Sequence, residues 1–276
     1  MVGGHVMTAI PDREWGVRVA ETANTATAAA REATALQERT ARGVPAEFNE
    51  RVGGWWLRHA PGCAWWVASV LPHGGASHAE LTERIEAAEA YCAERGVPTL
   101  VQMTPGAAPE RLDALLEARG YERRASVSLR TAVTSEVLRR APHGALRVRL
   151  QEQPTREWFD VLYEVVGGDA DAQWRLLERI SERCAYAGVL IGDETVAVGR
   201  AVAESGWAGV FSMATLPAAR GKGAAGAALG ALADWAAVND AERMYLQVEH
   251  ENEGAARIYG RVGFSELLPF YFRVKE

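Results

Sequence analysis

Two stretches of this chain, about 145 residues apart, carry similar sequence in the same order, and this limits the possible folds more than any other feature. The matching pairs are Ser-Val-Leu-Pro at 69–72 with Ala-Thr-Leu-Pro at 214–217, Leu-Val-Gln at 100–102 with Tyr-Leu-Gln at 245–247, and Ala-Arg-Gly-Tyr at 118–121 with Arg-Val-Gly-Phe at 261–264. Two α/β halves can match in this way by chance, but the near-constant spacing favours a duplicated domain. The 276 residues also suffice for two domains of ordinary size. We therefore expect one domain over 1–140, with an N-terminal helical extension, and a second over 141–276.

The hydrophobic pattern predicts a similar succession of strands and helices in both halves. In the first half we expect strands at 55–58, 64–71, 99–103 and 126–133, and helices at 15–36, at 79–95 and from Pro109 onward. In the second half we expect strands at 146–150, 186–191, 196–203, 207–214, 244–248 and 267–274, and helices near 158–166, 172–180, 224–238 and 253–262. Short turns make the three strands over 186–214 an antiparallel meander. The predicted fold class is α/β (α+β), with a mixed, mostly antiparallel sheet flanked by helices and duplicated in tandem.

Charge and cysteine content exclude several classes of protein. The net charge of -6 argues against nucleic acid as a partner, because phosphate binding needs a basic face, and it mildly favours a cationic substrate. The three cysteines are far apart and indicate neither a disulfide framework nor a zinc site. No apolar run approaches the roughly 20 residues that a membrane span needs, and the first residues lack a signal-peptide pattern. We expect a cytoplasmic protein without a membrane partner, as a monomer or homodimer.

The segment 213–226 carries the clearest chemical signal. An apolar strand ends at Pro217, a glycine-rich loop with Arg220 and Lys222 follows, and a helix of small residues comes next. Glycines let successive backbone N–H groups turn towards one anion, and the helix N-terminus adds partial positive charge. The segment therefore predicts a diphosphate-binding loop. It matches neither a P-loop nor a Rossmann fingerprint, because the first string is absent and the loop follows a meander rather than the first strand of a βαβ unit.

These residues resemble the GNAT N-acetyltransferase superfamily. Its diphosphate motif, [Q/R]-x-x-G-x-[G/A], is matched by Arg-Gly-Lys-Gly-Ala-Ala at 220–225. The downstream features of the family are also present in order, namely a strand at 245–248, Asn252, Tyr259 and Gly-Phe at 263–264. The resemblance covers about 146–276 well, and 50–135 only as a degenerate copy without the motif or the tyrosine. That first copy is expected to be a structural or substrate-shaping half.

The resemblance implies roles for individual residues, with acetyl-CoA as the acyl donor. The backbone of Met213 and Thr215 would pair with the pantetheine arm, and an N–H near Met213 and Ala214 would stabilise the oxyanion. The residues implied in cofactor binding are Met213, Ala214, Thr215, Arg220, Gly221, Lys222, Gly223, Ala224, Ala225, Gly226 and Asn252. Tyr259 would be the general acid, since a phenol with a pKa of about 10 can protonate a thiolate of similar basicity.

The general base is left open by the sequence. Gln247 stands where many members of the family carry a glutamate, and an amide cannot accept the amine proton. Strand alternation places Glu249 on the same face as Gln247, and Glu251 is close by. Either carboxylate could act through a water, or the amine could lose its proton to bulk solvent.

Several other residues have simpler interpretations than catalysis. His250 between two glutamates indicates an exposed turn rather than a metal site, and Cys184 indicates a small buried hydrophobic residue rather than a nucleophile. The Trp pairs at 55–56 and 65–66 are expected to alternate between the core and the inter-domain face, with an aromatic substrate pocket as the less favoured alternative. The helix at 15–36 takes its apolar content mostly from alanine, so we expect it to pack poorly or only against a partner surface.

Three functions are compatible with these features. The first is an acetyl-CoA-dependent N-acetyltransferase that acts on a small-molecule or peptide amine by direct attack within a ternary complex. The second is acetylation of a cysteinyl amine, as in the similar two-domain mycothiol synthase. The third is a non-catalytic CoA-binding sensor, favoured only by Gln247.

Overall fold

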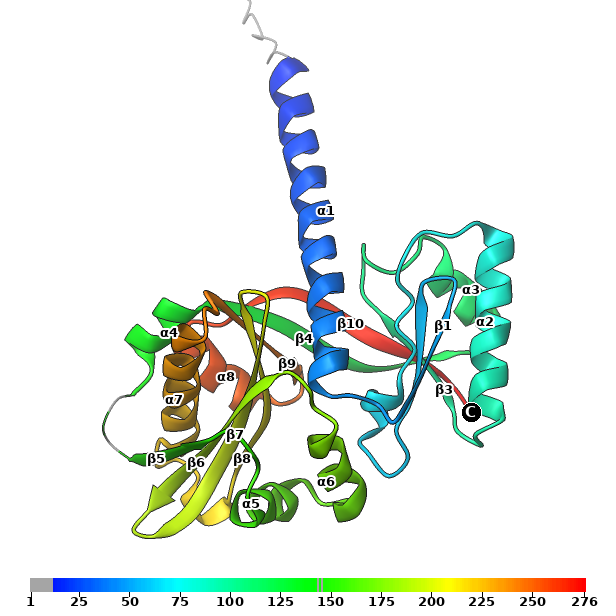
Figure 1. Ribbon diagram of the computed structural model, residues 1–276. Coiled ribbons are helices and arrows are strands. Elements are labelled where there is room, and N and C mark those ends of the chain that lie inside the picture. Colours follow the sequence, from blue (N-terminus) through cyan, green and yellow to red (C-terminus); the bar gives the residue numbers. More distant parts are fainter. Residues whose placement is uncertain (1–11, 143, 145) are drawn as a thin grey trace, which may run out of the picture.

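An eight-stranded sheet runs through the whole molecule (Figure 1). The structure is a computed structural model that describes residues 12–276 apart from 143 and 145, with side chains from residue 27 onward. The strands are ordered β3-β10-β4-β9-β8-β7-β6-β5, and every neighbouring pair is antiparallel except β8 and β9. The expected mixed, mostly antiparallel sheet flanked by helices is therefore confirmed.

The elements follow the predicted order closely. The first half contains α1 (Asp12–Gly43), β1 (Phe48–Val52), β2 (Trp55–His59), a 3₁₀ turn (Trp65–Ala68), α2 (His78–Ala93), β3 (Thr99–Met103), α3 (Leu112–Ala118), β4 (Glu122–Val133) and α4 (Thr134–Arg140). The second half contains β5 (Arg147–Gln151), α5 (Arg156–Val166), α6 (Ala170–Glu178), β6 (Arg183–Ile191), β7 (Glu194–Glu204), β8 (Trp207–Thr215), a 3₁₀ turn (Pro217–Ala219), α7 (Ala224–Val238), β9 (Arg243–Glu249), α8 (Glu253–Arg261) and β10 (Ser265–Lys275).

The two halves exchange their last strands. Strand β4 of the first half lies between β9 and β10 of the second, with Leu129 opposite Gln247. Strand β10 in turn pairs with β3 of the first half, with Phe272 opposite Gln102. The eight-stranded sheet is therefore built from strands of both halves, whereas β1 and β2 of the first half pair only with each other in a separate two-stranded sheet.

Helices cover both faces of the sheet and form separate cores. On one face, α4, α7 and α8 bury the largest apolar cluster, which includes Leu229, Leu232 and Val262. On the other face, α5 and α6 pack around Trp158, while α1 packs over β4, β9 and β10. The helices α2 and α3 form a further core with β2 and β3.

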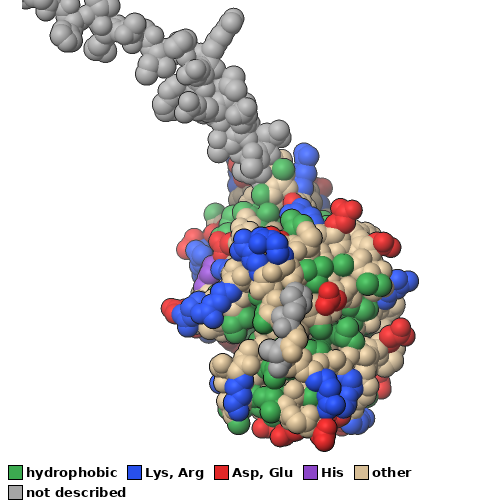
Figure 2. Space-filling model, turned by 90° about the vertical axis from the view of Figure 1, so that its left-hand side faces the viewer, with side chains coloured by type: hydrophobic (Ala, Val, Ile, Leu, Met, Phe, Trp, Pro, Cys, Tyr) green, Lys and Arg blue, Asp and Glu red, His purple; other side chains and the backbone are tan. Residues whose placement is uncertain are grey.

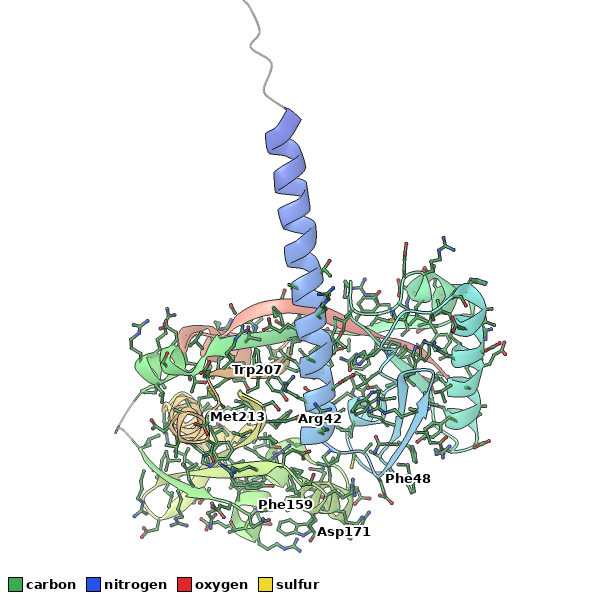
Figure 3. The ribbon with its side chains drawn as sticks, turned by 45° about the horizontal axis from the view of Figure 1, so that its top comes forward. Arg42, Phe48, Phe159, Asp171, Trp207 and Met213 are labelled. Carbon is green, nitrogen blue, oxygen red and sulfur yellow. The ribbon has the colours of Figure 1, made fainter. Side chains whose placement is uncertain are left out.

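Helix α1 corrects the expectation that its alanine-rich stretch packs poorly or only against a partner. Ala33 and Leu36 have no exposed surface and lie against Phe270 and Phe272 of β10. Small side chains let the helix approach the sheet closely, so that its last turns enter between the two halves (Figure 1). Figure 3 shows Arg42 of α1 in this central position, between Phe48 of the first half and Phe159 of the second. Ala30 and Ala33 therefore serve packing within the chain, and the side chains of residues 15–26 of the predicted helix lie outside the described ones.

The segment 64–71 is a second correction, because a 3₁₀ turn replaces the predicted strand. The guanidinium of Arg58 fills the inside of this turn and donates to the carbonyl oxygen of Ser69 at 2.9 Å and to that of Trp66 at 3.4 Å. These tertiary hydrogen bonds curl the chain, and only the end of the segment keeps strand-like bridges, at Val70 and Leu71. The helix expected from Pro109 also begins later, at Leu112.

On the face that Figure 2 shows, basic side chains do not gather into one patch that could bind a polyanion. Acidic and basic side chains are interspersed there, over the side of the molecule that carries α4 and α7 (Figures 1 and 2). Among the helices of residues 12–276, apart from 143 and 145, none has the length and apolar character needed to cross a membrane.

Candidate active site

Strands β8 and β9 separate from each other and open the sheet. They pair only from Trp207 to Gly209, against the first residues of β9, and diverge beyond that point. A bulge in β8 coincides with the divergence, because the register to β7 shifts there and Ser212 has a left-handed φ of 52°. Gly199 of β7 makes room for Met213, since a Cβ at Gly199 would lie 2.4 Å from the sulfur. Because β9 has diverged at this point, the backbone of β8 around Met213 has no pairing strand on that side.

The glycine-rich loop leads into α7 as the motif predicts. Gly221 and Gly223 have φ values of 76° and 83°, and a Cβ at either position would meet no atom within 4 Å. Gly223 is the N-cap of α7 and supplies no side-chain cap, so that the first N–H groups of the helix remain available to an anion. Arg220 and Lys222 are exposed, and neither side chain has an ion-pair partner among the described residues. This arrangement suits a phosphate group.

Not every small residue of the motif faces this loop. A Cβ at Gly226 would lie 2.9 Å from the ring of Pro142, and one at Gly230 would lie 3.2 Å from the Cβ of Ala141. Ala224 is itself buried. At these positions the small side chains let α7 pack against the end of α4, whereas Ala225 is half-buried.

Helix α8 carries the two predicted residues beyond β9. Asn252 is its N-cap, and its side-chain oxygen accepts a hydrogen bond from the N–H of Ala255 at 3.1 Å. Tyr259 is buried at 9% exposure and lies edge-on to Phe264. Burial raises the pKa of Tyr259 to about 12, because the phenolate would lose its hydration. The phenol is therefore protonated at every ordinary pH.

A cavity of about 550 Å³ lies where the separated strands meet the junction of the two halves. Its walls come from α1, the 3₁₀ turn at 65–68, α5, α6, β7, β8, β9 and α8. Of the predicted site residues it brings together Met213, Gln247, Glu249, Asn252 and Tyr259. The separation of β8 from β9 joins this cavity, which is covered by α1, α5 and α6, to the opposite face with α7 and α8.

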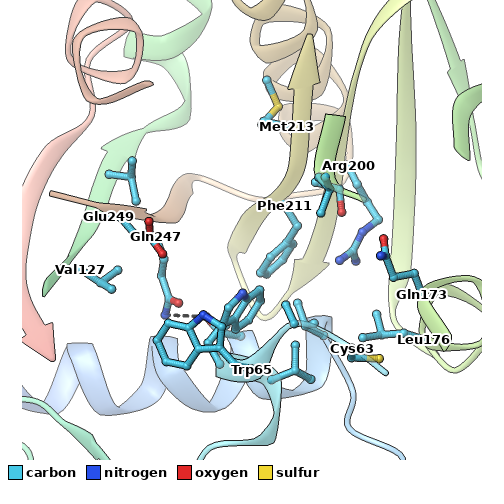
Figure 4. A pocket seen from close by; sticks show the side chains of 18 of the residues that line it. Cys63, Trp65, Val127, Gln173, Leu176, Arg200, Phe211, Met213, Gln247 and Glu249 are labelled. Carbon is cyan, nitrogen blue, oxygen red and sulfur yellow. Dashed lines mark hydrogen bonds between the residues drawn. The ribbon is translucent and has the colours of Figure 1, made fainter. Parts of the chain in front are cut away.

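Gln247 and Glu249 lie on the same face of β9 and point to the same side of the cavity (Figure 4). The amide of Gln247 donates a hydrogen bond of 3.4 Å to the hydroxyl of Thr40 on α1. Glu249 is exposed at the end of the strand. Glu251 lies in the exposed turn that follows. Glu249 is thus the carboxylate nearest in sequence to Gln247 that also lines the cavity.

The remaining candidates take structural roles. The imidazole of His250 lies 2.7 Å from the hydroxyl of Ser126 and 3.0 Å from a carboxylate oxygen of Glu266. In the described part of the chain, no group of three or more His, Cys, Asp and Glu side chains could hold a metal ion. Cys184 is buried, and burial raises the pKa of its thiol. Trp65 and Trp66 line the cavity, which favours the alternative in which these tryptophans form an aromatic pocket.

Sequence reasoning missed the parts of the cavity that come from distant segments. Gln37 and Thr40 reach it from α1, and Arg58 and Arg200 reach it from β2 and β7. Arg200 left a signal in the sequence, because it interrupts the apolar strand 196–203. An arginine at such a position is either paired or functional.

Comparisons with known proteins agree with this site. The family model described as "Probable histone acetyltransferase Rv0428c C-terminal" matches residues 8–267. The curated "Uncharacterized N-acetyltransferase YobR" of Bacillus subtilis (strain 168) is 25% identical over 249 residues, which cover 87% of this chain and 97% of that protein.

Solved structures show the same fold. A GCN5-related N-acetyltransferase from Kribbella flavida superposes with a TM-score of 0.66 at 17% identity, over 90% of this chain and 95% of that one. A tandem GNAT protein from the clavulanic acid biosynthesis pathway superposes with a TM-score of 0.60 at 11% identity, over 82% of this chain and 81% of that one. The chain is therefore an acyltransferase of the GNAT superfamily and belongs to the family of the Rv0428c C-terminal region.

Proposed function

We propose that the protein transfers an acetyl group from acetyl-CoA to a primary amine by direct attack within a ternary complex. The observation that carries this proposal is the separation of β8 from β9, which places Met213 of β8 and Tyr259 of α8 on one cavity, while β8 continues into the glycine-rich loop before α7. One substrate can approach from each face of the sheet, and the two meet at the opening. Direct transfer needs such a meeting point, since no covalent enzyme intermediate is involved.

The donor side uses backbone groups more than side chains. The N–H groups from Gly221 to Gly226 would bind the diphosphate, and the unpaired side chains of Arg220 and Lys222 would add positive charge. The edge of β8 from Met213 to Thr215 would pair with the pantetheine arm as an added strand. Asn252 would contribute to the same arm near the start of α8, although its side chain also caps that helix.

The chemistry requires a proton to leave the amine and another to reach the sulfur. The neutral amine attacks the thioester carbonyl, a C–N bond forms, and the C–S bond breaks with release of a thiolate. A backbone N–H at the bulge near Met213 would stabilise the oxyanion, and Tyr259 would give its proton to the thiolate. The amine proton would pass to Glu249, directly or through water, because Gln247 cannot accept it.

We also propose that the first half is a degenerate copy of the second, with the boundary near residue 140. The chain at Val70 bridges β3 in parallel, as β8 does with β9, and a helix follows at the equivalent position in each half. The segment 73–78 replaces the diphosphate loop and contains neither Arg nor Lys. This half would shape the acceptor site, because Cys63, Trp65 and Trp66 form one wall of the cavity.

Two measurements test the proposed function together. Calorimetry with CoA tests the donor site, and release of free thiol from acetyl-CoA in the presence of a panel of amines tests transfer. Binding together with amine-dependent thiol release is the expected result. Binding without turnover on any amine would contradict transfer and favour the sensor, and the absence of CoA binding would contradict the assigned loop.

A further inference from the structure

The cavity has an uneven distribution of charge. Among the described residues that line it, Glu249 is the only carboxylate, while Arg58 and Arg200 supply two guanidinium groups. Figure 4 shows Glu249 and Gln247 on one side of the cavity and Arg200 on the other, with the ring of Phe211 between them. Glu249 and Arg200 therefore lie at separate places along the cavity wall.

Arg200 is buried without an acidic partner. Its side chain is 1% exposed, lies over the ring of Phe211 at 4.8 Å, and donates one hydrogen bond of 2.8 Å to the carbonyl oxygen of Gly43. Its Nε is buried and has no hydrogen-bond partner, and no carboxylate forms an ion pair with it among the described residues. Burial lowers the pKa of its guanidinium, and the groups that oppose this shift are the thiol of Cys184 and the phenols of Tyr186 and Tyr245 rather than a carboxylate.

Arg58 is a second buried arginine among the residues that line the cavity. It is 4% exposed and is held by the carbonyl and hydroxyl oxygens of Ser69, at 2.9 Å and 2.7 Å. Its Nη1 is buried and unpartnered, and no carboxylate of the described residues pairs with it. Burial lowers the pKa of Arg58 to about 10.

An unpaired buried charge is expensive, and proteins normally pair such groups with an anion. Among the described residues one further arginine is buried, and it follows this rule, because Arg273 forms ion pairs with Asp113 and Glu117. The two buried arginines without a carboxylate partner in this part of the chain both line the cavity. The missing anion is therefore expected to arrive with a ligand.

We infer that the acceptor is an amine that also carries a carboxylate, which Arg200 binds while the amine lies towards Glu249 and Tyr259. This inference rests on the proposed acetyl transfer and names the class of its acceptor. A guanidinium offers two parallel N–H groups that match the two oxygens of a carboxylate. The aromatic wall formed by Trp65, Trp66, Phe211, Phe270 and Phe272 suits an apolar body between the two charged ends.

The experiment compares each amino acid with its own carboxamide at equal concentrations of the neutral amine, so that size and nucleophile concentration are held constant. The pairs are L-phenylalanine, L-tryptophan, L-leucine and 6-aminohexanoate with the corresponding amides, assayed for kcat/KM by thiol release from acetyl-CoA. We expect at least one acid to exceed its amide by about 100-fold, the size of effect that follows loss of a charged hydrogen-bonding partner. Equal rates for every acid and its amide would overturn the inference.

Variants of Arg200 locate the effect. In Arg200→Gln the ratio of acid to amide should fall close to one while the rate on the amide is kept, and Arg200→Lys should restore part of the ratio. A misfolded variant would lose both substrates, so that the ratio separates recognition from stability. Arg42→Gln is the matched control, because Arg42 pairs with Glu204 outside the cavity lining and its loss should leave the ratio unchanged. An unchanged ratio in Arg200→Gln would contradict the assignment.

A binding measurement keeps the inference testable apart from catalysis. Calorimetry with N-acetyl-L-phenylalanine and N-acetyl-L-phenylalaninamide compares the acid and amide forms of a product. Preference of the wild-type protein for the acid, lost in Arg200→Gln, supports the carboxylate site even when no amine is acetylated. CoA binding and thiol release without any preference for an acid would leave the transfer function intact and overturn only the carboxylate site.

Discussion

Tyr259 combines two properties at the level of a single residue. It is almost fully buried, and it lines the cavity where the separated strands meet α8. Burial raises the pKa of its phenol to about 12, so that the group holds its proton until a base of comparable strength appears beside it. In water a thiolate is a weaker base than this phenolate, because the pKa of a thiol is about 8.5, but burial raises the pKa of a thiol as well. A thiolate released inside the cavity therefore approaches the basicity of the buried phenolate, whereas water does not. This environment suits a general acid.

Replacement of Tyr259 by phenylalanine tests this role. The ring packing against Phe264 is kept, and only the proton donor is lost, so we expect kcat to fall by about 100-fold while the Kd for CoA changes less than about twofold. Steady-state kinetics and calorimetry measure the two quantities. A large loss of CoA affinity would indicate that the hydroxyl binds the cofactor instead.

The pH profile tests the same residue in the wild-type enzyme. Because the pKa of Tyr259 is raised to about 12, the acid form persists well above pH 10, and the rate should rise with pH as the acceptor amine loses its proton. We expect no decline in kcat below about pH 10. A falling limb with a midpoint near pH 9 that disappears in Tyr259→Phe would contradict the raised pKa.

The sequence predicts the placement of residues that depends on their own strand or helix, but it does not predict contacts with distant segments. Strand alternation alone places Gln247 and Glu249 on one face, and the structure confirms this. The hydrogen-bond partner of Arg200, Gly43, lies far away in sequence at the end of α1, whereas Phe211 is on the next strand. A pattern of period two says that Arg200 is buried in a sheet, but it does not say that a cavity adjoins it.

At the level of elements, α7 was predictable and the turn at 65–68 was not. The bounds of α7 follow from its small apolar residues and from Gly223 before it, and they match the predicted 224–238. The turn depends on the side chain of Arg58, which comes from β2 and has no signature in the segment itself. Local signals therefore predict the glycine-rich loop and α7, whereas tertiary contacts determine the cavity wall at 65–68.

Gly223→Val tests the start of α7. A side chain at φ 83° is strained, and the space around it is open, so the variant should distort or block the loop rather than disturb the core. We expect CoA affinity to fall by more than about tenfold, with little change in thermal stability. Gly96→Val is a control, because Gly96 also has a positive φ of 63° and open space but lies in the turn after α2, far from this loop in sequence. Equal affinity in both variants would remove the loop from the donor site.

Leu36→Ala tests whether α1 is part of the folded body. Leu36 has no exposed surface and packs with the aromatic residues of β10, so its truncation should lower the free energy of unfolding by about 2–5 kcal/mol. Leu150 of β5 is 42% exposed, and Leu150→Ala should change it by less than about 1 kcal/mol. Urea denaturation measures both. Equal small effects would show that α1 packs only loosely.

For the whole molecule, the sequence repeat predicts the order of strands and helices, but it does not predict which strands pair with each other. The pattern of β4 and that of β10 fit either half equally well, because alternation defines faces and not neighbours. The structure joins the halves through β4, which lies between β9 and β10, and through β10, which pairs with β3. Helix α1 and the 3₁₀ turn then close the cavity from the side of the first half. The cavity is therefore formed by both halves, although the glycine-rich loop belongs to one.

The exchange of strands predicts that the donor half does not fold alone. A fragment of residues 141–276 lacks β4, so that β9 and β10 lose their common neighbour and expose the buried side chains that face Leu129. We expect this fragment to be aggregated or unfolded by circular dichroism and unable to bind CoA, even though it contains the complete diphosphate motif. Coexpression with residues 1–140 should restore a folded complex that binds CoA, because the missing strand is then supplied in trans. A folded fragment that binds CoA by itself would show that the two halves share their sheet without depending on it.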